Sequence, residues 1–116
     1  MNMNTEIGGL CPRVEAVFAL LARKWAGPIV FSLKDGERRF CDLERALPDI
    51  SARVLTQRVR ELEDAGLVER LAMGCSPARV GYRLTSRGLA LAEALEPLVD
   101  WAKSLSAAVS RPSSSA

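Results

Sequence analysis

One stretch of the chain, residues 50–70 (ISARVLTQRVRELEDAGLVER), constrains the fold more than any other. A helix advances about 100° per residue, so a helix that begins at Ala52 gathers its aliphatic side chains on one side. These side chains are Leu55, Val59 and Leu62. Ser51 is a favoured N-cap residue, and Gly66 is a favoured residue just beyond a helix end. The spacing therefore predicts one long amphipathic helix with a buried aliphatic face.

The opposite face of this helix is polar in its first half and acidic towards its end. The polar residues are Arg53, Thr56, Gln57 and Arg60. Arginine and glutamine can form paired hydrogen bonds with base edges, and hydroxyl groups can bond to phosphate. We therefore predict that these four residues, together with Ser51, contact DNA. Taken alone, a helix with outward arginines is more often only a solvated face.

The segments around this helix predict a helix-turn-helix followed by a β-hairpin wing. A short helix is expected at 41–49, stopped by Pro48 and joined to the long helix by a tight turn. Residues 67–72 and 79–84 alternate as strands do, and the segment between them contains Gly, Ser and Pro. A further short extended piece is expected at 37–40. The order of these elements is more specific than any one of them.

The charge of the chain is informative through its distribution. The net charge is only +2, from 16 Lys and Arg against 14 Asp and Glu, so DNA binding cannot rest on bulk charge. Arginines outnumber acids between residues 51 and 87, although an arginine-rich proteome would give the same bias. Arginine matches phosphate and guanine better than lysine does. We predict that Arg79 and Arg83, on the hairpin, approach phosphate or the minor groove.

The remaining helices suggest how two copies would meet. Pro12 suits the first turn of a helix over 12–22, and another helix is expected over 28–36. The last helix, capped by Thr85, is expected to run to about Val109. It carries a heptad-like series with Trp101 beside it: Leu91, Leu95, Leu98 and Leu105. We predict that these five residues form a homodimer interface, the alternative being a core stripe within one domain.

The expected fold is mainly α with a small β-hairpin wing, a winged helix-turn-helix of about five helices and two to three short strands. We expect one domain over residues 11–109, with dimerisation helices at both ends. Residues 1–10 are expected to form a flexible N-terminal arm, and residues 110–116, rich in serine, a disordered tail.

Several classes of protein are disfavoured by what the sequence lacks. It has no histidine, no CxxC pair and no glycine-rich phosphate loop, so we predict no metal site, no cofactor and no enzymatic activity. The longest apolar run, residues 16–22, is too short to span a bilayer. No basic segment followed by an apolar one opens the chain, so we expect a cytoplasmic protein without membrane partners.

Three single cysteines raise the question of thiol chemistry. Cys11 comes just before a helix that begins with proline, and Arg13 is close by. Helix N-terminal amides and positive charge stabilise a thiolate. Cys41 also heads a helix, although Phe40 suggests a partly packed setting, and nothing evident activates Cys75. Each cysteine could equally be an inert small residue, but Cys11 is the best candidate for a redox sensor.

The chain resembles the HxlR-type winged helix-turn-helix transcriptional regulators, which are related to the MarR group. The resemblance spans residues 11–101 and rests on an ordered set of residues: Cys11-Pro12, Lys24-Trp25, Pro28-Ile29, Arg39-Phe40, Leu43, Ile50-Ser51, Leu55-Thr56, Leu62-Glu63, Gly66-Leu67-Val68, Arg70, Tyr82, Leu84-Thr85, Gly88, Pro97 and Trp101. It implies a dimeric bacterial DNA-binding regulator that often responds to electrophiles, quinones, aldehydes or oxidants. In several members a cysteine at the position of Cys11 is the sensor. Cys41 and Gly81 depart from the residues usual in the family.

These observations predict a dimeric, sequence-specific transcriptional regulator. It would bind a near-palindromic operator in double-stranded DNA and be switched by thiol modification with an oxidant, quinone or aldehyde. The alternative is a winged-helix protein-interaction module that does not bind DNA. The outward polar face of residues 52–64 favours the regulator, because an interaction surface would more often present apolar anchors.

Overall fold

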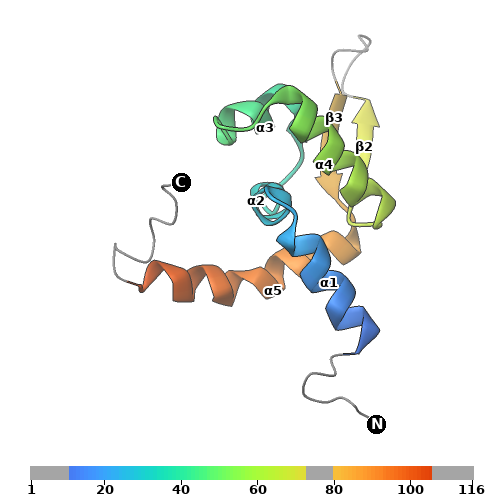
Figure 1. Cartoon of the computed structure of the whole chain (residues 1–116). Helices are drawn as coiled ribbons and strands as arrows, with labels where there is room; N and C mark the ends of the chain where they lie inside the picture. The colour runs from blue at the N-terminus through green and yellow to red at the C-terminus, as the bar shows by residue number, and fades with distance from the viewer. Residues whose placement is uncertain (1–10, 73–79, 106–116) are drawn as a thin grey trace.

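The computed structural model describes residues 11–72 and 80–105. These residues form five helices and a three-stranded antiparallel sheet (Figure 1). In chain order the elements are α1 (Pro12–Ala22), α2 (Ala26–Ser32), β1 (Arg38–Arg39), α3 (Phe40–Ala46), α4 (Ala52–Asp64), β2 (Val68–Ala72), β3 (Val80–Leu84) and α5 (Ser86–Lys103). This arrangement confirms the predicted winged helix-turn-helix fold.

The long helix α4 begins and ends where its sequence predicts. The Ser51 hydroxyl accepts a hydrogen bond from the Val54 amide at 3.1 Å, which satisfies one of the unpaired amides of the first turn. Gly66, just beyond the helix, has φ = +79°, a conformation that glycine adopts without strain. The buried side chains are the predicted aliphatic ones, Leu55, Val59 and Leu62.

The sheet has the strand order β1-β3-β2, so the hairpin of β2 and β3 is extended by the short strand β1. Tyr82 in β3 lies opposite Arg70 in β2 and opposite Arg38 in β1. The predicted hairpin tip, residues 73–78, and Arg79 lie outside the described residues.

A single core joins the helices to the wing. Ile29 and Val30 of α2 are fully buried, together with Leu43 of α3 and the aliphatic face of α4. Tyr82 closes the core from the sheet side. Figure 1 shows α2 at the centre, with α3, α4 and the hairpin on one side and α5 with most of α1 on the other.

Several boundaries differ from those expected. The helix α2 covers Ala26–Ser32 rather than 28–36, and α3 ends at Ala46 rather than at residue 49. The helix α3 begins at Phe40, which shortens the predicted extended piece to Arg38–Arg39. The helix α5 ends at Lys103, before the predicted Val109, and Leu105 lies beyond it. There the amide and the hydroxyl of Ser104 both donate to the Trp101 carbonyl, at 3.0 and 2.6 Å, so the last turn tightens and stops.

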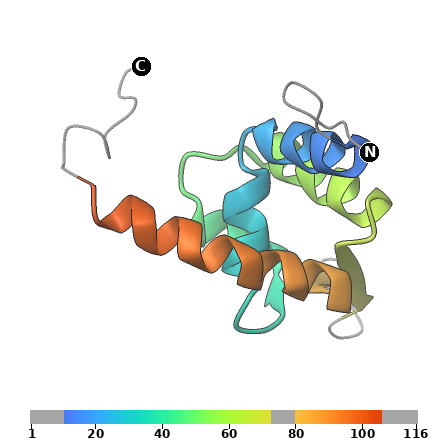
Figure 2. The same cartoon turned by 90° about the horizontal axis from the view of Figure 1, so that it is seen from below.

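The second half of α5 extends past the rest of the fold. Seen from below in Figure 2, α5 crosses the body beside α2 and then continues away from it. In the part of the chain that the structure describes, no helix is both long and apolar enough to cross a membrane.

Candidate nucleic-acid interface

The exposed side of α4 carries the four residues predicted to contact bases, Arg53, Thr56, Gln57 and Arg60, which we call the recognition face. All four are exposed and line one shallow hollow. The Thr56 hydroxyl donates to the Ala52 carbonyl at 2.8 Å, and Gln57 Nε2 donates to Glu61 Oε2 at 3.4 Å. Within residues 11–72 and 80–105, the guanidinium groups of Arg53 and Arg60 have no ion-pair partner. The two arginines of the recognition face therefore offer uncommitted donors to a ligand.

Glu61, one turn further along α4, was not singled out in the sequence. Its carboxylate accepts two hydrogen bonds from Arg23, which follows α1: Nε at 3.2 Å and Nη2 at 2.8 Å. Hydrogen bonding to Arg23, more than any other contact, lowers the pKa of Glu61 below its usual value. Arg58 also donates from Nε to the Lys24 carbonyl at 2.8 Å. These contacts tie α4 to the end of α1, and no local sequence pattern marks them.

The wing supplies less free charge than the sequence suggested. Arg83 Nε lies 2.6 Å from Glu69 Oε2 on the neighbouring strand, so its charge is already paired. Arg70 is similarly paired with Glu63 at 3.2 Å. Arg79, which was predicted to reach phosphate, lies outside the described residues, so its role stays a prediction.

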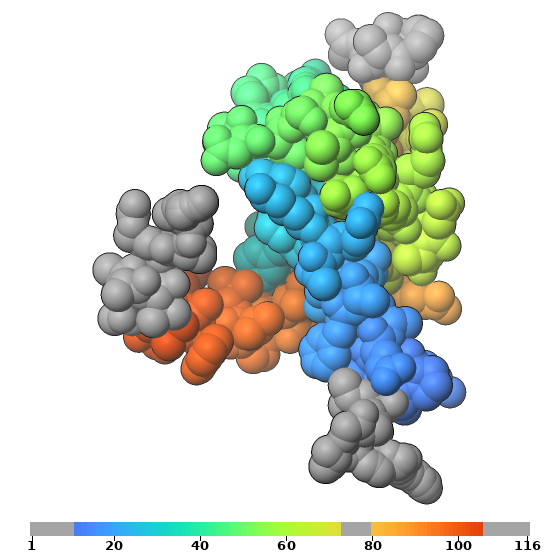
Figure 3. All heavy atoms as spheres, viewed as in Figure 1, coloured from blue at the N-terminus to red at the C-terminus, as the bar shows by residue number. Residues whose placement is uncertain are grey.

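The two terminal helices α1 and α5 leave large apolar side chains exposed. Figure 3 shows both helices on the side of the molecule away from the wing. The helix α1 has no buried residue, and Val14, Val17 and Phe18 are all exposed, Phe18 by 59%. On α5, Leu98 is 53% exposed and Trp101 60% exposed. We call these five residues the apolar face. Large apolar side chains exposed in groups mark an interaction surface, and here each of the two helices carries its own group.

The predicted leucine series on α5 divides into two parts. Leu91 and Leu95 are partly buried and pack against the core of their own chain. Leu98 and Trp101 are exposed, and Leu105 is half-buried beyond the helix end. The first part of the series therefore contributes to the core within one chain, and a dimer interface formed by the second part stays a prediction.

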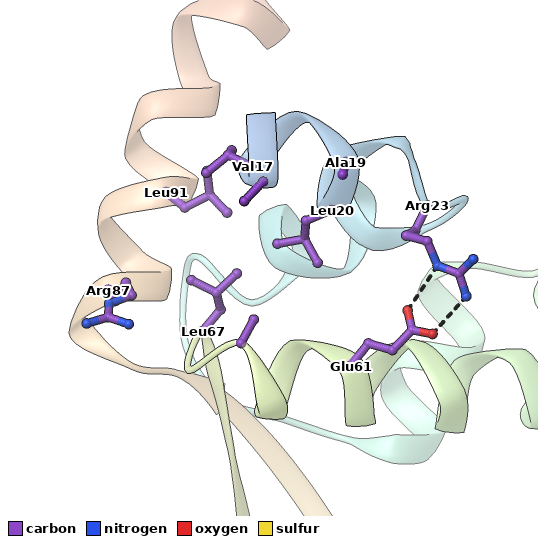
Figure 4. Close-up of a pocket in the computed structure, with 10 residues that line it drawn as sticks. Val17, Ala19, Leu20, Arg23, Glu61, Leu67, Arg87 and Leu91 are labelled. Carbon is purple, nitrogen blue, oxygen red and sulfur yellow. Dashed lines mark hydrogen bonds and ion pairs between the residues drawn. The ribbon is translucent and has the colours of Figure 1, made fainter. Parts of the chain in front are cut away.

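A hollow of about 620 Å³ lies between α1, the end of α4 and the start of α5 (Figure 4). Val17 and Leu20 line it from α1, and Leu67 and Leu91 line it from the other side. The Arg23–Glu61 pair lies at its edge (Figure 4). The hollow is mainly apolar and adjoins the apolar face through Val17.

Two of the three cysteines can be placed. Cys11 is exposed, unbonded and at the N-cap position of α1, as expected for an accessible thiol. Cys41 is also exposed, with Arg45 Nη2 3.9 Å from its sulfur, so the partly packed setting expected for it is wrong. The reason is that Phe40 and Leu43 turn towards the core while Cys41 lies on the outer side of α3. Cys75 lies outside the described residues.

Comparison with known proteins places this fold in a family. Residues 20–109 match the model of a family described as HxlR-like helix-turn-helix. The chain belongs to this family. It is 43% identical over 93 residues to YvaP of Bacillus subtilis, an HTH-type transcriptional regulator, covering 80% of this chain and 86% of YvaP. It is 38% identical over 93 residues to the HTH-type transcriptional regulator YodB of the same organism, covering 80% of this chain and 83% of YodB.

Solved structures of HxlR-like relatives have the same fold. The reduced form of YodB from B. subtilis gives a TM-score of 0.73 at 35% identity and covers 85% of this chain and 97% of that one. Quinone-bound YodB gives 0.69 at 34% identity, with 83% and 100% covered. This HxlR-like chain is therefore a helix-turn-helix transcriptional regulator, and the resemblance noted in its sequence is confirmed. Among the described residues, no group of three or more His, Cys, Asp or Glu could hold a metal ion.

Proposed function

We propose that the protein is a homodimeric regulator that binds a near-palindromic operator through α4 and the wing, and whose affinity for DNA changes when a thiol is modified. The observation that carries the proposal is the recognition face, where donors suited to base edges lie exposed on the second helix of a helix-turn-helix. We take residues 11–109 as the working domain, with residues 1–10 as an arm and 110–116 as a tail.

In this proposal, α4 enters the major groove. Arg53, Gln57 and Arg60 contact base edges, and the Ser51 hydroxyl donates to phosphate, which Thr56 can do only if its hydroxyl leaves the Ala52 carbonyl. Arg79 contacts phosphate or the minor groove from the wing, and Arg83 joins it only if its pair with Glu69 opens.

The DNA contacts are tested by measuring binding to selected operator DNA and to unrelated DNA. Gln57→Ala should weaken the specific complex by about 1–3 kcal/mol and leave non-specific binding unchanged. Arg79→Ala should weaken both complexes and reduce the salt dependence. If the parent protein binds no duplex DNA above background, the alternative of a protein-interaction module replaces this proposal.

The dimer is supported by the apolar face. An exposed Trp, Phe and Leu on the outer sides of α1 and α5 form the kind of surface that a second copy would cover. Of the interface predicted from the sequence, the part with Leu98, Trp101 and Leu105 would then continue into α1, while Leu91 and Leu95 pack against the core of their own chain. A twofold axis there would place two copies of α4 about one helical turn of DNA apart, or a multiple of that distance.

The thiol switch is supported by the exposed Cys11 at the start of α1 and by two relatives. YodB has been solved in reduced, quinone-bound and diamide-treated forms, and HypR in reduced and oxidized forms. We propose that oxidation or alkylation of Cys11 changes how the two subunits pack through α1, and with it the spacing of the two recognition helices.

The switch is tested by measuring operator affinity with and without diamide or a quinone. The parent is compared with Cys11→Ser and with Cys41→Ser as the matched exposed-thiol control. The parent and Cys41→Ser should respond, and Cys11→Ser should not. A response that persists in Cys11→Ser would exclude Cys11 as the sensor, and no response in any of them would exclude thiol control.

A further inference from the structure

Glu61 lies between the end of α1 and the recognition face. Its carboxylate receives the forked pair of hydrogen bonds from Arg23 on one side. On the other side it accepts from Gln57 Nε2 at 3.4 Å. Arg58 Nη1 lies 3.5 Å from the same carboxylate. Forked Arg–carboxylate pairs are directional and strong for exposed groups, so Arg23 fixes where the carboxylate points.

An ionised carboxylate can only accept hydrogen bonds, so it decides which way the Gln57 amide faces. The NH₂ group must point towards Glu61, since a carbonyl oxygen there would be repelled. The lowered pKa of Glu61, caused first by hydrogen bonding to Arg23, keeps this carboxylate ionised at neutral pH. One of the two N–H groups of Gln57 is then engaged within the protein. The carbonyl oxygen and the second N–H remain free on the same outer edge of the amide.

That free edge has the pattern of one acceptor beside one donor. In the major groove, adenine presents the complementary pattern through its N6 amino group and N7, whereas guanine presents two acceptors. We propose that Glu61 is a positioning residue that holds the Gln57 amide ready for adenine, and that Arg23 holds Glu61 in turn. This inference rests on the proposed DNA-binding function of α4.

The arrangement also links α1 to base selection. Arg23 is the C-cap residue that follows α1, and α1 carries part of the apolar face. A displacement of α1 relative to α4 would separate Arg23 from Glu61 and free the Gln57 amide to rotate. Base preference at one position of the operator would therefore depend on the position of α1.

The experiment selects DNA from a library of duplexes with a random central segment. The parent is compared with Gln57→Ala, Glu61→Ala and Arg23→Gln. Asp64→Ala is the matched control, because it removes one exposed acid from the same end of α4 without a contact to Gln57. Binding is then measured to the selected duplex and to the three single-base changes at each position. Melting temperatures show whether each variant is folded.

The parent should prefer adenine at one position in each half-site, and Gln57→Ala should lose that preference there alone. Glu61→Ala should reduce it at least threefold at the same position, and Arg23→Gln should reduce it less. Asp64→Ala should keep it, although both acid-to-alanine variants should bind all DNA somewhat more tightly through lost repulsion of phosphate.

Each other outcome overturns a defined part of the reasoning. If the parent selects no motif, the proposed function fails, and this inference fails with it. If the parent selects a motif but Gln57→Ala changes a position where the preferred base is not adenine, or changes none, the inference alone is wrong. It is also wrong if folded Glu61→Ala keeps the parent's preference. If Glu61→Ala does not fold, Arg23→Gln decides the matter by the same comparison.

Discussion

Gly88, in the first turn of α5, tests how closely this helix packs on the rest of the domain. A Cβ atom at this position would lie 2.0 Å from the carbonyl oxygen of Leu67 and 3.0 Å from Cδ2 of Leu84. The same carbonyl accepts a hydrogen bond from the Thr85 amide at 3.0 Å. The Thr85 hydroxyl donates to the Gly66 carbonyl at 2.7 Å. The contact at 2.0 Å is with backbone, so α5 would have to move as a whole.

Gly88→Ala should therefore destabilise the fold even though alanine favours helices. Overpacking of a core typically costs about 1–3 kcal/mol, and the upper end applies where backbone blocks the new atom. Loss of one hydrogen bond to the α4–β2 junction adds about 1 kcal/mol. Replacing glycine by alanine within a helix stabilises the helix by about 1 kcal/mol, which offsets part of this cost. The net loss in the free energy of unfolding is about 3 kcal/mol.

This loss can be measured by thermal unfolding, with every variant at the same protein concentration, because any self-association would also stabilise the fold. For a chain of 116 residues the unfolding entropy is roughly 0.24 kcal/mol/K, so the melting temperature should fall by about 12 °C. Gly27→Ala is the matched control, because its Cβ would meet only Leu21 Cδ2 at 4.0 Å, and it should melt at or slightly above the parent's temperature. A Gly88→Ala protein that melts within about 2 °C of the parent would refute the packing argument.

Three further outcomes follow from the described contacts. Leu98→Glu, which places a charge on the apolar face, should give monomers in sedimentation, whereas Leu89→Glu, on the opposite side of α5, should sediment as the parent does. Hydrogen bonding, first to Arg39, lowers the pKa of Asp42. The ionised Asp42 carboxylate therefore stabilises the fold above the unfolded pKa of about 4, and this contribution is lost as pH falls through the lower folded pKa. In denaturant titrations, Asp42→Asn should show a smaller loss of stability below about pH 4 than the parent does. Ser51→Ala, which removes the cap of α4, should lower the free energy of unfolding by about 1 kcal/mol in the same assay.

The sequence predicted α4 well because everything that defines this helix is local. The cap at Ser51, the aliphatic spacing and the glycine beyond the end all act within a few residues of one another. The hairpin strands were predicted for the same reason, since alternation is a property of each strand alone. The end of α5 was not, because Ser104 and Lys103 are both compatible with a longer helix. At its end the Ser104 hydroxyl donates to the Trp101 carbonyl, a contact that no residue pattern specifies.

The candidate site divides in the same way. The exposure of Arg53, Gln57 and Arg60 follows from helical periodicity, so the sequence was enough to find them. The contact of Arg23 with Glu61 joins residues 38 positions apart and depends on where α1 ends against α4. The pairing of Arg83 with Glu69 depends on strand register, which the sequence left open. Charge balance at a surface is therefore the least predictable part of such a site.

The helix α1 connects these features. A helix of 11 residues is marginal by itself in water, and α1 buries none of its residues within the chain. Leu20 packs against the core, and the Arg23–Glu61 pair holds the end of the helix, but Val14, Val17 and Phe18 stay exposed in one copy. A second copy that covered them would stabilise α1 and the contact at Glu61 together. Assembly, the accessibility of Cys11 and the orientation of Gln57 would then change as one, because all three depend on where this one helix lies.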